Sequence, residues 1–285
     1  MKLGLSSYSL SRAIAANELS LADAIAWVAD HGGEHIEIVP IGFDLTDNPE
    51  TINLIRKKTE EAGIEISNYA IGANFITEDE AAFENEISRV MKEVDIASAL
   101  GVKLMRHDVA SRNDTSMKQF LADLPKLAEA CRRIADYAQP LGITTSVENH
   151  GYFIQASDRV QALVHEVNRA NFRTTLDIGN FMCADEDSVA ATKKNIDIAS
   201  MVHIKDFYLR PSNLNPGQGW FQSASGNYLR GAIAGQGDIN MREVLRVVKQ
   251  SGYDGYLSIE FEGMEDCRLG SEIGLANVRR LWDEI

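Results

Sequence analysis

Strand-like and helix-like patterns alternate eight times along this chain. Each strand-like run is short and apolar, and most recur at a spacing of roughly 30 residues, the length of a βα unit. The runs centre on Leu3–Tyr8, His35–Val39, Glu65–Tyr69, Val102–His107, Thr144–Glu148, Thr174–Asp177, Met201–Ile204 and Tyr256–Phe261. The alternation predicts a parallel sheet, and eight units predict closure into a (β/α)8 TIM barrel. We expect residues 1–285 to form one domain, with a doubly wound open sheet as the alternative fold.

Between the strand-like runs, apolar residues recur with the period of an amphipathic helix. A glycine follows most of these stretches: Gly63 comes after Ile52 and Ile55, and Gly101 comes after a stripe that begins at Phe83. Glycine just past a helix adopts the left-handed conformation that ends it. These glycines therefore mark the predicted carboxyl ends of the helices.

The charge balance bears on the partners of the protein. Asp and Glu number 42 against 28 Lys and Arg, which gives a formal net charge of −14. Such a field repels polyanions, so nucleic acid and anionic membranes are poor partners. No apolar stretch approaches the roughly 20 residues of a membrane helix, and the amino terminus does not resemble a signal sequence. Three cysteines without a zinc-type spacing suit a reducing compartment, so we expect a cytoplasmic protein.

Four side chains that can bind a metal stand where the last four strand-like runs end. They are Glu148, Asp177, His203 and Glu260. A glutamate at a strand end is more often a salt-bridge partner, and a lone histidine is commonly a core residue. The set is a stronger signal, because parallel strands bring their carboxyl ends to one barrel face, where catalytic residues gather. Burying three carboxylates there would be very costly without a cation.

The donor set indicates which cation is suitable. Three carboxylates and one imidazole disfavour a structural zinc site, which prefers cysteine and histidine. The set suits Mn²⁺ best, with Mg²⁺, Co²⁺ or Zn²⁺ also possible. Positions would remain open for two substrate oxygens.

One connection is much longer than the others. Residues 207–238, rich in glycine and proline, follow the seventh strand-like run and must start on the face that carries the four ligand candidates. Loops of this length are usually functional. Its aromatic residues include Trp220, which either stacks on a sugar or packs the loop onto the barrel. We treat Trp220 as a candidate substrate contact.

Three further residues are candidates for substrate binding. His150 lies two residues after Glu148, and Lys205 lies two residues after His203, so each points to the same side as its neighbour if the strand continues. His107 ends the fourth strand-like run. Each has a structural alternative, as a surface or core histidine or as the partner of a carboxylate.

Four motifs occur in order along the chain: Val-Glu-Asn-His-Gly at 147–151, Leu-Asp-Ile-Gly-Asn at 176–180, His-Ile-Lys-Asp at 203–206 and Ser-Ile-Glu-Phe-Glu-Gly at 258–263. By these motifs the chain resembles the xylose isomerase-like TIM-barrel superfamily, and within it the sugar phosphate isomerase/epimerase group. The likeness covers nearly the whole chain. The resemblance implies that Glu148, Asp177, His203 and Glu260 hold one divalent cation. It also implies that Glu148 and Glu260 act as the acid/base pair.

This arrangement predicts metal-assisted proton transfer next to a carbonyl group, through an enediolate. We expect a sugar or keto-sugar isomerase or epimerase. Loss of a β-hydroxyl from the same enediolate would instead give a dehydratase acting on a keto-inositol or related polyol. A non-catalytic sugar-binding barrel is a third possibility, although it would need neither glutamate.

The chain departs from some relatives of this fold. Ketose 3-epimerases carry histidine three residues after the aspartate ligand and arginine six after the histidine ligand, where this chain has Asn180 and Leu209. Abasic-site endonucleases need more histidines, including one at position 180. Both activities are therefore disfavoured. The expected partner is a small carbohydrate; oligomers are common in the family, but no interface signature is visible.

Overall fold

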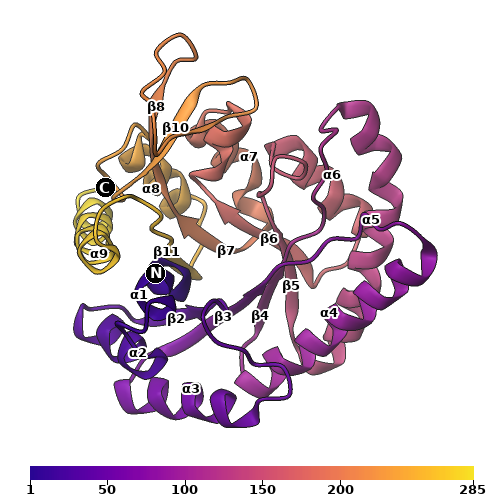
Figure 1. The fold of residues 1–285 in the computed structure, drawn as a ribbon, viewed down its shortest axis with the longest axis horizontal. Coiled ribbons are helices and arrows are strands. Elements are labelled where there is room, and N and C mark those ends of the chain that lie inside the picture. Colours follow the sequence, from indigo (N-terminus) through magenta and orange to yellow (C-terminus); the bar gives the residue numbers. More distant parts are fainter.

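The computed structural model describes all 285 residues and contains a closed barrel of eight parallel strands (Figure 1). The order around the barrel is β1-β11-β7-β6-β5-β4-β3-β2. Their bounds are β1 Lys2–Ser6, β2 His35–Ile38, β3 Glu65–Ile71, β4 Leu104–His107, β5 Thr144–Glu148, β6 Phe172–Asp177, β7 Ala199–Ile204 and β11 Tyr256–Ile259. The predicted barrel is confirmed, and each strand end lies within about two residues of its expected position.

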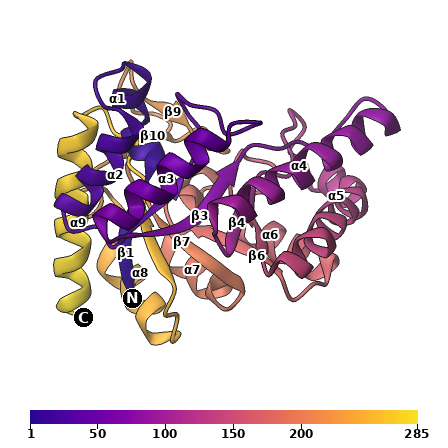
Figure 2. The same ribbon diagram turned by 90° about the horizontal axis from the view of Figure 1, so that it is seen from below.

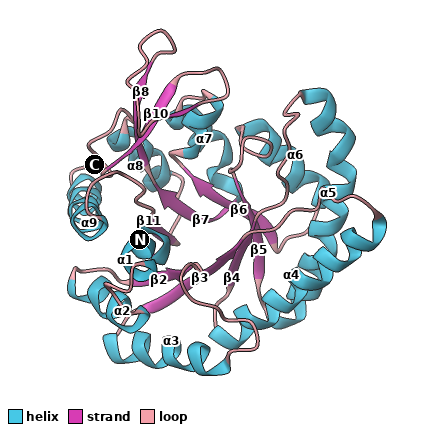
Figure 3. Cartoon of the chain, viewed as in Figure 1, coloured by secondary structure: helices cyan, strands magenta, loops and turns pink.

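Helices surround the barrel on its outside (Figure 3). They are α1 Ser11–Ala15, α2 Leu21–Asp30, α3 Pro49–Ala62, α4 Glu80–Leu100, α5 Met117–Ala138, α6 Ser157–Val167, α7 Ser188–Asn195, α8 Met241–Gln250 and α9 Cys267–Asp283. Gly63 and Gly101 end α3 and α4 with φ of 69° and 84°, so the predicted left-handed stops are confirmed. None of these helices combines the length and the apolar character needed to cross a membrane. The first strand and the last helix lie side by side (Figures 1 and 2).

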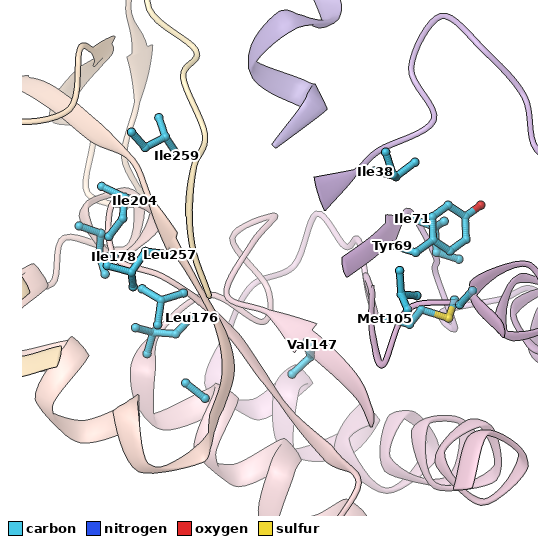
Figure 4. Close-up of a cluster of buried hydrophobic side chains, with 14 of the residues drawn as sticks. Ile38, Tyr69, Ile71, Met105, Val147, Leu176, Ile178, Ile204, Leu257 and Ile259 are labelled. Carbon is cyan, nitrogen blue, oxygen red and sulfur yellow. The ribbon is translucent and has the colours of Figure 1, made fainter. Parts of the chain in front are cut away.

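Alternation along each strand separates two environments. Apolar side chains such as Val147, Leu176 and Ile204 are buried in the main hydrophobic cluster, and Figure 4 shows part of that cluster. Successive side chains of a strand point to opposite faces. The intervening residues, such as Glu148 and His203, therefore point into the barrel. The barrel interior is consequently polar at its carboxyl end, and the apolar layer outside it holds the fold together.

The long connection contains a small sheet, which corrects the expectation of an open loop at residues 207–238. Its strands are β8 Asp206–Arg210, β9 Phe221–Gln222 and β10 Tyr228–Ala232, arranged antiparallel in the order β8-β10-β9. We call this hairpin sheet the arm. Figure 1 shows β8 and β10 extending beyond the barrel near α7 and α8. The strands at 206–210 and 228–232 are short and lie in a segment rich in glycine and proline, so the sequence does not mark them as a sheet.

A buried carboxylate fastens the base of the arm. Asp206 Oδ2 accepts hydrogen bonds from the backbone N–H groups of Gly235 and Gly237, each at 2.9 Å. Its Oδ1 accepts from the N–H of Phe207 at 2.9 Å and of Ile239 at 3.4 Å. A Cβ atom at Gly237 would lie 2.6 Å from the Phe207 carbonyl oxygen, so the chain can approach this closely only with glycine there.

Replacing Asp206 with asparagine should destabilise the protein. The amide nitrogen cannot accept a hydrogen bond, so two of the four backbone N–H groups lose their acceptor, at a cost of about 0.5–1.5 kcal/mol each. Urea unfolding measures this loss. Asp158→Asn is the control, because the Asp158 side chain is 73% exposed in a surface ion pair. Equal unfolding free energies for the two variants would contradict the role assigned to Asp206.

Candidate metal and active site

The four predicted ligands meet at the carboxyl end of the barrel. Glu148, Asp177 and His203 come from β5, β6 and β7, and Glu260 directly follows β11, which is the next strand in the barrel. One ligand atom from each lies within 4.8 Å of the others, and all four residues are buried. The strand register produces this grouping, because Asp177 pairs directly with His203.

The orientation of His203 is set by a carboxylate from across the barrel. Its Nε2 lies 2.9 Å from Glu37 Oε2, and Glu37 also accepts a hydrogen bond from Asn68 at 2.7 Å. The other ring nitrogen, Nδ1, faces Glu260 at 3.7 Å and Glu148 at 3.8 Å and has no hydrogen-bond partner. A buried imidazole nitrogen aimed at carboxylates, with a carboxylate behind the ring, fits a divalent metal site.

Asp177 presents a single oxygen to the cluster. Its Oδ1 accepts hydrogen bonds from the backbone N–H groups of Gly179 and Asn180, both at 2.8 Å. These bonds hold the turn that follows β6 and fix the rotamer of the carboxylate. Its Oδ2 lies 3.2 Å from Lys205 Nζ and faces the other ligands.

The two glutamates have different surroundings. Arg106 Nη2 lies 2.6 Å from Glu148 Oε2, and Asn180 donates to Glu148 Oε1 at 3.0 Å. Burial alone would raise the pKa of Glu148, but the charges of Arg106 and His203 hold it well below its usual value. Burial instead raises the pKa of Glu260, although Lys205 Nζ lies only 2.6 Å away.

Lys205 is the central cation of the cavity floor. Besides Glu260 and Asp177, its Nζ lies 3.6 Å from Glu262. Burial lowers the pKa of Lys205, but the surrounding carboxylates raise it well above its usual value. The ammonium group is therefore charged, and it can donate to a substrate oxygen beside the two glutamates.

A cavity of about 380 Å³ opens above the cluster. Glu148, Glu260 and Lys205 line it, and so does His150, whose Nδ1 lies 3.4 Å from Asp108 Oδ1. Its other polar lining residues are Tyr8, Arg89, Glu93, Arg106, Asp108 and Glu262, and its apolar ones are Val39, Pro40, Ile41, Ala70 and Ile71. The structure thus places Glu148 and Glu260, the predicted acid/base pair, in one cavity with two of the predicted substrate contacts.

Two predicted substrate contacts do not line this cavity. His107 is fully buried on the helix side of β4, with its ring near Phe75 and Phe172, because alternation turns Arg106 into the barrel instead. Trp220 belongs to the arm and contacts the guanidinium groups of Arg210 and Arg230. Of the two roles considered for Trp220, the structure therefore supports packing of the long connection.

Sequence patterns gave little weight to several residues of the site. No local pattern distinguishes Glu37, Tyr8 and Glu262 from ordinary surface or core residues, and Asn180 stands out only as a departure from relatives. The period of two places Arg106 and His107 on opposite faces, but it does not say which face is inside. The role of Glu37 depends on contact across the barrel, which no local pattern reports.

Comparison with known proteins identifies relatives of the whole chain. A family model described as xylose isomerase-like TIM barrel matches residues 25–281. Inosose dehydratase from Clostridium perfringens is 22% identical over 227 residues, covering 75% of each chain. Inosose dehydratase from Lactiplantibacillus plantarum is 25% identical over 243 residues, covering 79% of each chain.

Solved structures share the fold at lower identity. D-psicose 3-epimerase from Clostridium cellulolyticum superposes with a TM-score of 0.76 at 17% identity, covering 99% of each chain. The probable 3-DHS dehydratase from Bacillus anthracis gives 0.72 at 17% identity, covering 99% of this chain and 98% of the other. Epimerases and a dehydratase thus share this architecture, and the fold alone does not separate the two reactions.

Replacing Glu37 with glutamine should weaken metal binding without unfolding the barrel. The neutral amide no longer raises the basicity of His203, and loss of such partners typically lowers metal affinity about 10–100-fold. Calorimetric titration with Mn²⁺ measures the change. Glu65→Gln is the control, because Glu65 bonds Lys2 and Tyr256 at the amino-terminal end of the barrel. Unchanged affinity in Glu37→Gln would remove Glu37 from the site.

Proposed function

The chain belongs to the xylose isomerase-like TIM-barrel family, and from that premise we propose that it is a metal-dependent dehydratase of a cyclic keto-polyol such as a keto-inositol. The observation that supports this most is the pair Glu148 and Glu260, which flank Lys205 on one cavity floor. The dehydratase relatives favour elimination over the isomerase or epimerase expected from the motifs.

The reaction needs one proton removed and one delivered. One glutamate of the pair takes the proton from the carbon beside the carbonyl, and the C–H electron pair forms an enediolate. The C–O bond on the following carbon then breaks, and that oxygen accepts a proton from the second glutamate and leaves as water. The product is the enol of a diketone. Lys205 lies beside Glu260 and can donate a hydrogen bond to the substrate oxygen that gains charge.

The residues present fit a divalent cation. Glu148, Asp177, His203 and Glu260 would hold it, and His203 Nδ1 offers a buried nitrogen with no other partner. When bound, the ion supplies Lewis-acid stabilisation of negative charge on substrate oxygens. Mn²⁺ is our choice for the metal, because oxygen-rich sites with one imidazole suit it.

The charge of the cavity favours an uncharged substrate. Each cation in its lining already lies beside carboxylates: Arg106 contacts Glu148 and Asp108, and Lys205 contacts Glu260. Arg89 is similarly paired with glutamates of its own helix. No lining cation is therefore free to neutralise a phosphate, so we expect the substrate to lack one.

The shape of the cavity favours a ring. Val39, Pro40 and Ile41 follow β2, and Ile71 ends β3, whereas the ligands and Lys205 follow the opposite strands of the barrel. Apolar side chains, together with Arg89 and Glu93, thus face a polar floor. A cyclic polyol presents C–H groups on one face and oxygens around its edge, which matches such a cavity.

An isomerase or epimerase is the second candidate function. The same two glutamates can return the proton to the opposite face or to the neighbouring carbon. Structural similarity to D-psicose 3-epimerase is compatible with this chemistry. A dehydratase substrate must carry, on the β-carbon, a hydroxyl group that can leave. A substrate that is only isomerised or epimerised does not need one.

Incubation of the protein and Mn²⁺ with a keto-inositol should produce ultraviolet absorbance from the enol form of the diketone product. Phosphorylated ketoses should not react, because the lining cations are paired. The same panel in D₂O separates the candidates: exchange of deuterium into recovered substrate or its isomer without new absorbance supports the isomerase or epimerase. Absence of both signals, across cyclic and open-chain keto-sugars, would contradict both enzymatic functions.

Replacing Glu260 with glutamine should abolish turnover while the barrel remains folded. The amide cannot exchange a proton with substrate, and loss of one acid–base group typically lowers the rate about 10²–10⁴-fold. Steady-state kinetics measures the rate, and circular dichroism with thermal unfolding checks the fold. Full activity in Glu260→Gln would exclude Glu260 from the mechanism.

A further inference from the structure

The turn of the arm is fastened to the segment that follows β6. Asp185 Oδ1 accepts hydrogen bonds from Ser223 Oγ at 2.6 Å and Asn227 Nδ2 at 2.8 Å. Asp185 Oδ2 accepts from the backbone N–H of Ser225 at 2.7 Å. One carboxylate thus holds three donors of the β9–β10 turn. Asp185 has a φ of 57° and directly follows the 3-10 helix η3 (Asn180–Ala184).

A second contact connects the arm to the segment that follows β5. Tyr152 donates from its hydroxyl to the Gln222 carbonyl oxygen at 2.6 Å. The backbone N–H of Tyr152 donates to Gln155 Oε1 at 2.5 Å, and Gln155 Nε2 donates to the Asn180 carbonyl oxygen at 2.8 Å. Hydrogen bonds therefore join the arm and the segments after β5 and β6 into one block. Tyr152, which belongs to this block, lies two positions after His150 in the sequence.

This block ends at the catalytic floor. Asn180 Nδ2 donates to Glu148 Oε1 at 3.0 Å, and Asn180 Oδ1 accepts from Lys205 Nζ at 3.3 Å. Asn180 is buried and does not line the cavity. Its side chain instead bridges one member of the acid/base pair to the central cation. A shift of the η3 segment would therefore move Glu148 and Lys205 relative to each other.

We propose that Asp185 is a positioning residue, which fixes Asn180, and through it Glu148 and Lys205, by anchoring the arm. The inference rests on the proposed function, because it concerns the alignment of the same acid/base site. Asp185 is absent from the cavity lining and acts only through its neighbours. This gives the long connection a role that does not require Trp220 to contact substrate.

Anchoring by Asp185 is separable from folding of the barrel. The base of the arm keeps its own attachment through Asp206, and Phe207 and Leu229 are fully buried beside Cys183. Loss of Asp185 removes three hydrogen bonds of the turn but leaves the one from the Ala224 N–H to the Cys183 carbonyl oxygen at 2.8 Å. The turn should therefore loosen while the barrel and the base of the arm remain intact. Because misalignment of about 1 Å can lower a rate about 10²-fold, activity should respond more than stability does.

The test is a double-mutant cycle in the full-length protein with Mn²⁺. Asp185→Ala and the pair Ser223→Ala with Asn227→Ala should each lower kcat/KM for the keto-inositol about tenfold. All three changes together should cost less than the sum of the two sets, because both sets break the hydrogen bonds of Asp185 to Ser223 and Asn227. Asp185→Asn should recover part of the loss, since it keeps an oxygen for Ser223 and Asn227.

The matched control is Asp136→Ala. It removes a surface carboxylate that pairs with Arg169 and lies near the carboxyl end of α5. It should leave kcat/KM unchanged. If Asp185→Ala keeps kcat/KM within about twofold of wild type, or if the two sets of changes add independently, Asp185 has no positioning role.

Hydrogen exchange supplies a measurement that does not depend on the reaction. Asp185→Ala should accelerate amide exchange at residues 149–156 and 178–184 but not at β1–β3. Unchanged exchange in both segments would overturn the proposal even if the enzyme is active. Conversely, a wild-type protein that turns over no keto-sugar would refute the proposed function, while accelerated exchange would still uphold the anchoring by Asp185.

Discussion

The mutual repulsion of buried carboxylates is the constraint on which the functional end of this barrel depends. Glu148, Asp177 and Glu260 present oxygens within 4.8 Å of one another and of His203. Charges this close are tolerated only where cations and hydrogen-bond donors compensate them. Arg106 and Lys205 supply part of that compensation. A divalent ion held by the same four side chains would supply more, and it would bring Lewis-acid chemistry to the floor of the cavity.

Strand alternation explains how one barrel is both stable and reactive. Leu176 packs in the hydrophobic layer outside the barrel, whereas Asp177, the next residue, points inside. The apolar layer supplies the free energy of folding. Because that layer stabilises the fold, the polar interior can hold carboxylates that repel one another. Backbone hydrogen bonds, such as those from Gly179 and Asn180 to Asp177, fix the charged side chains in place.

The sequence was most informative where a pattern is local or repeats. Eight alternations predicted the barrel, and a polar residue at the end of each late strand predicted the four-residue cluster. Contacts across the barrel left no such trace: Glu37 meets His203 although 166 positions separate them. The arm was missed because its strands are short, one of them has only two residues, and Gly231 lies within another. The sequence pattern favoured His107 over Arg106 as a substrate contact. Neighbouring residues of a strand point to opposite faces, and the pattern alone does not show which of the two points into the barrel.

The most direct test of the account is a crystal structure of the protein grown with Mn²⁺, using anomalous scattering to locate the metal. We predict one manganese peak per chain, coordinated by oxygens of Glu148, Asp177 and Glu260 and by His203 Nδ1. A fully occupied ion elsewhere, with these four side chains uncoordinated, would contradict the proposed site. The chemistry built on it would then have no basis.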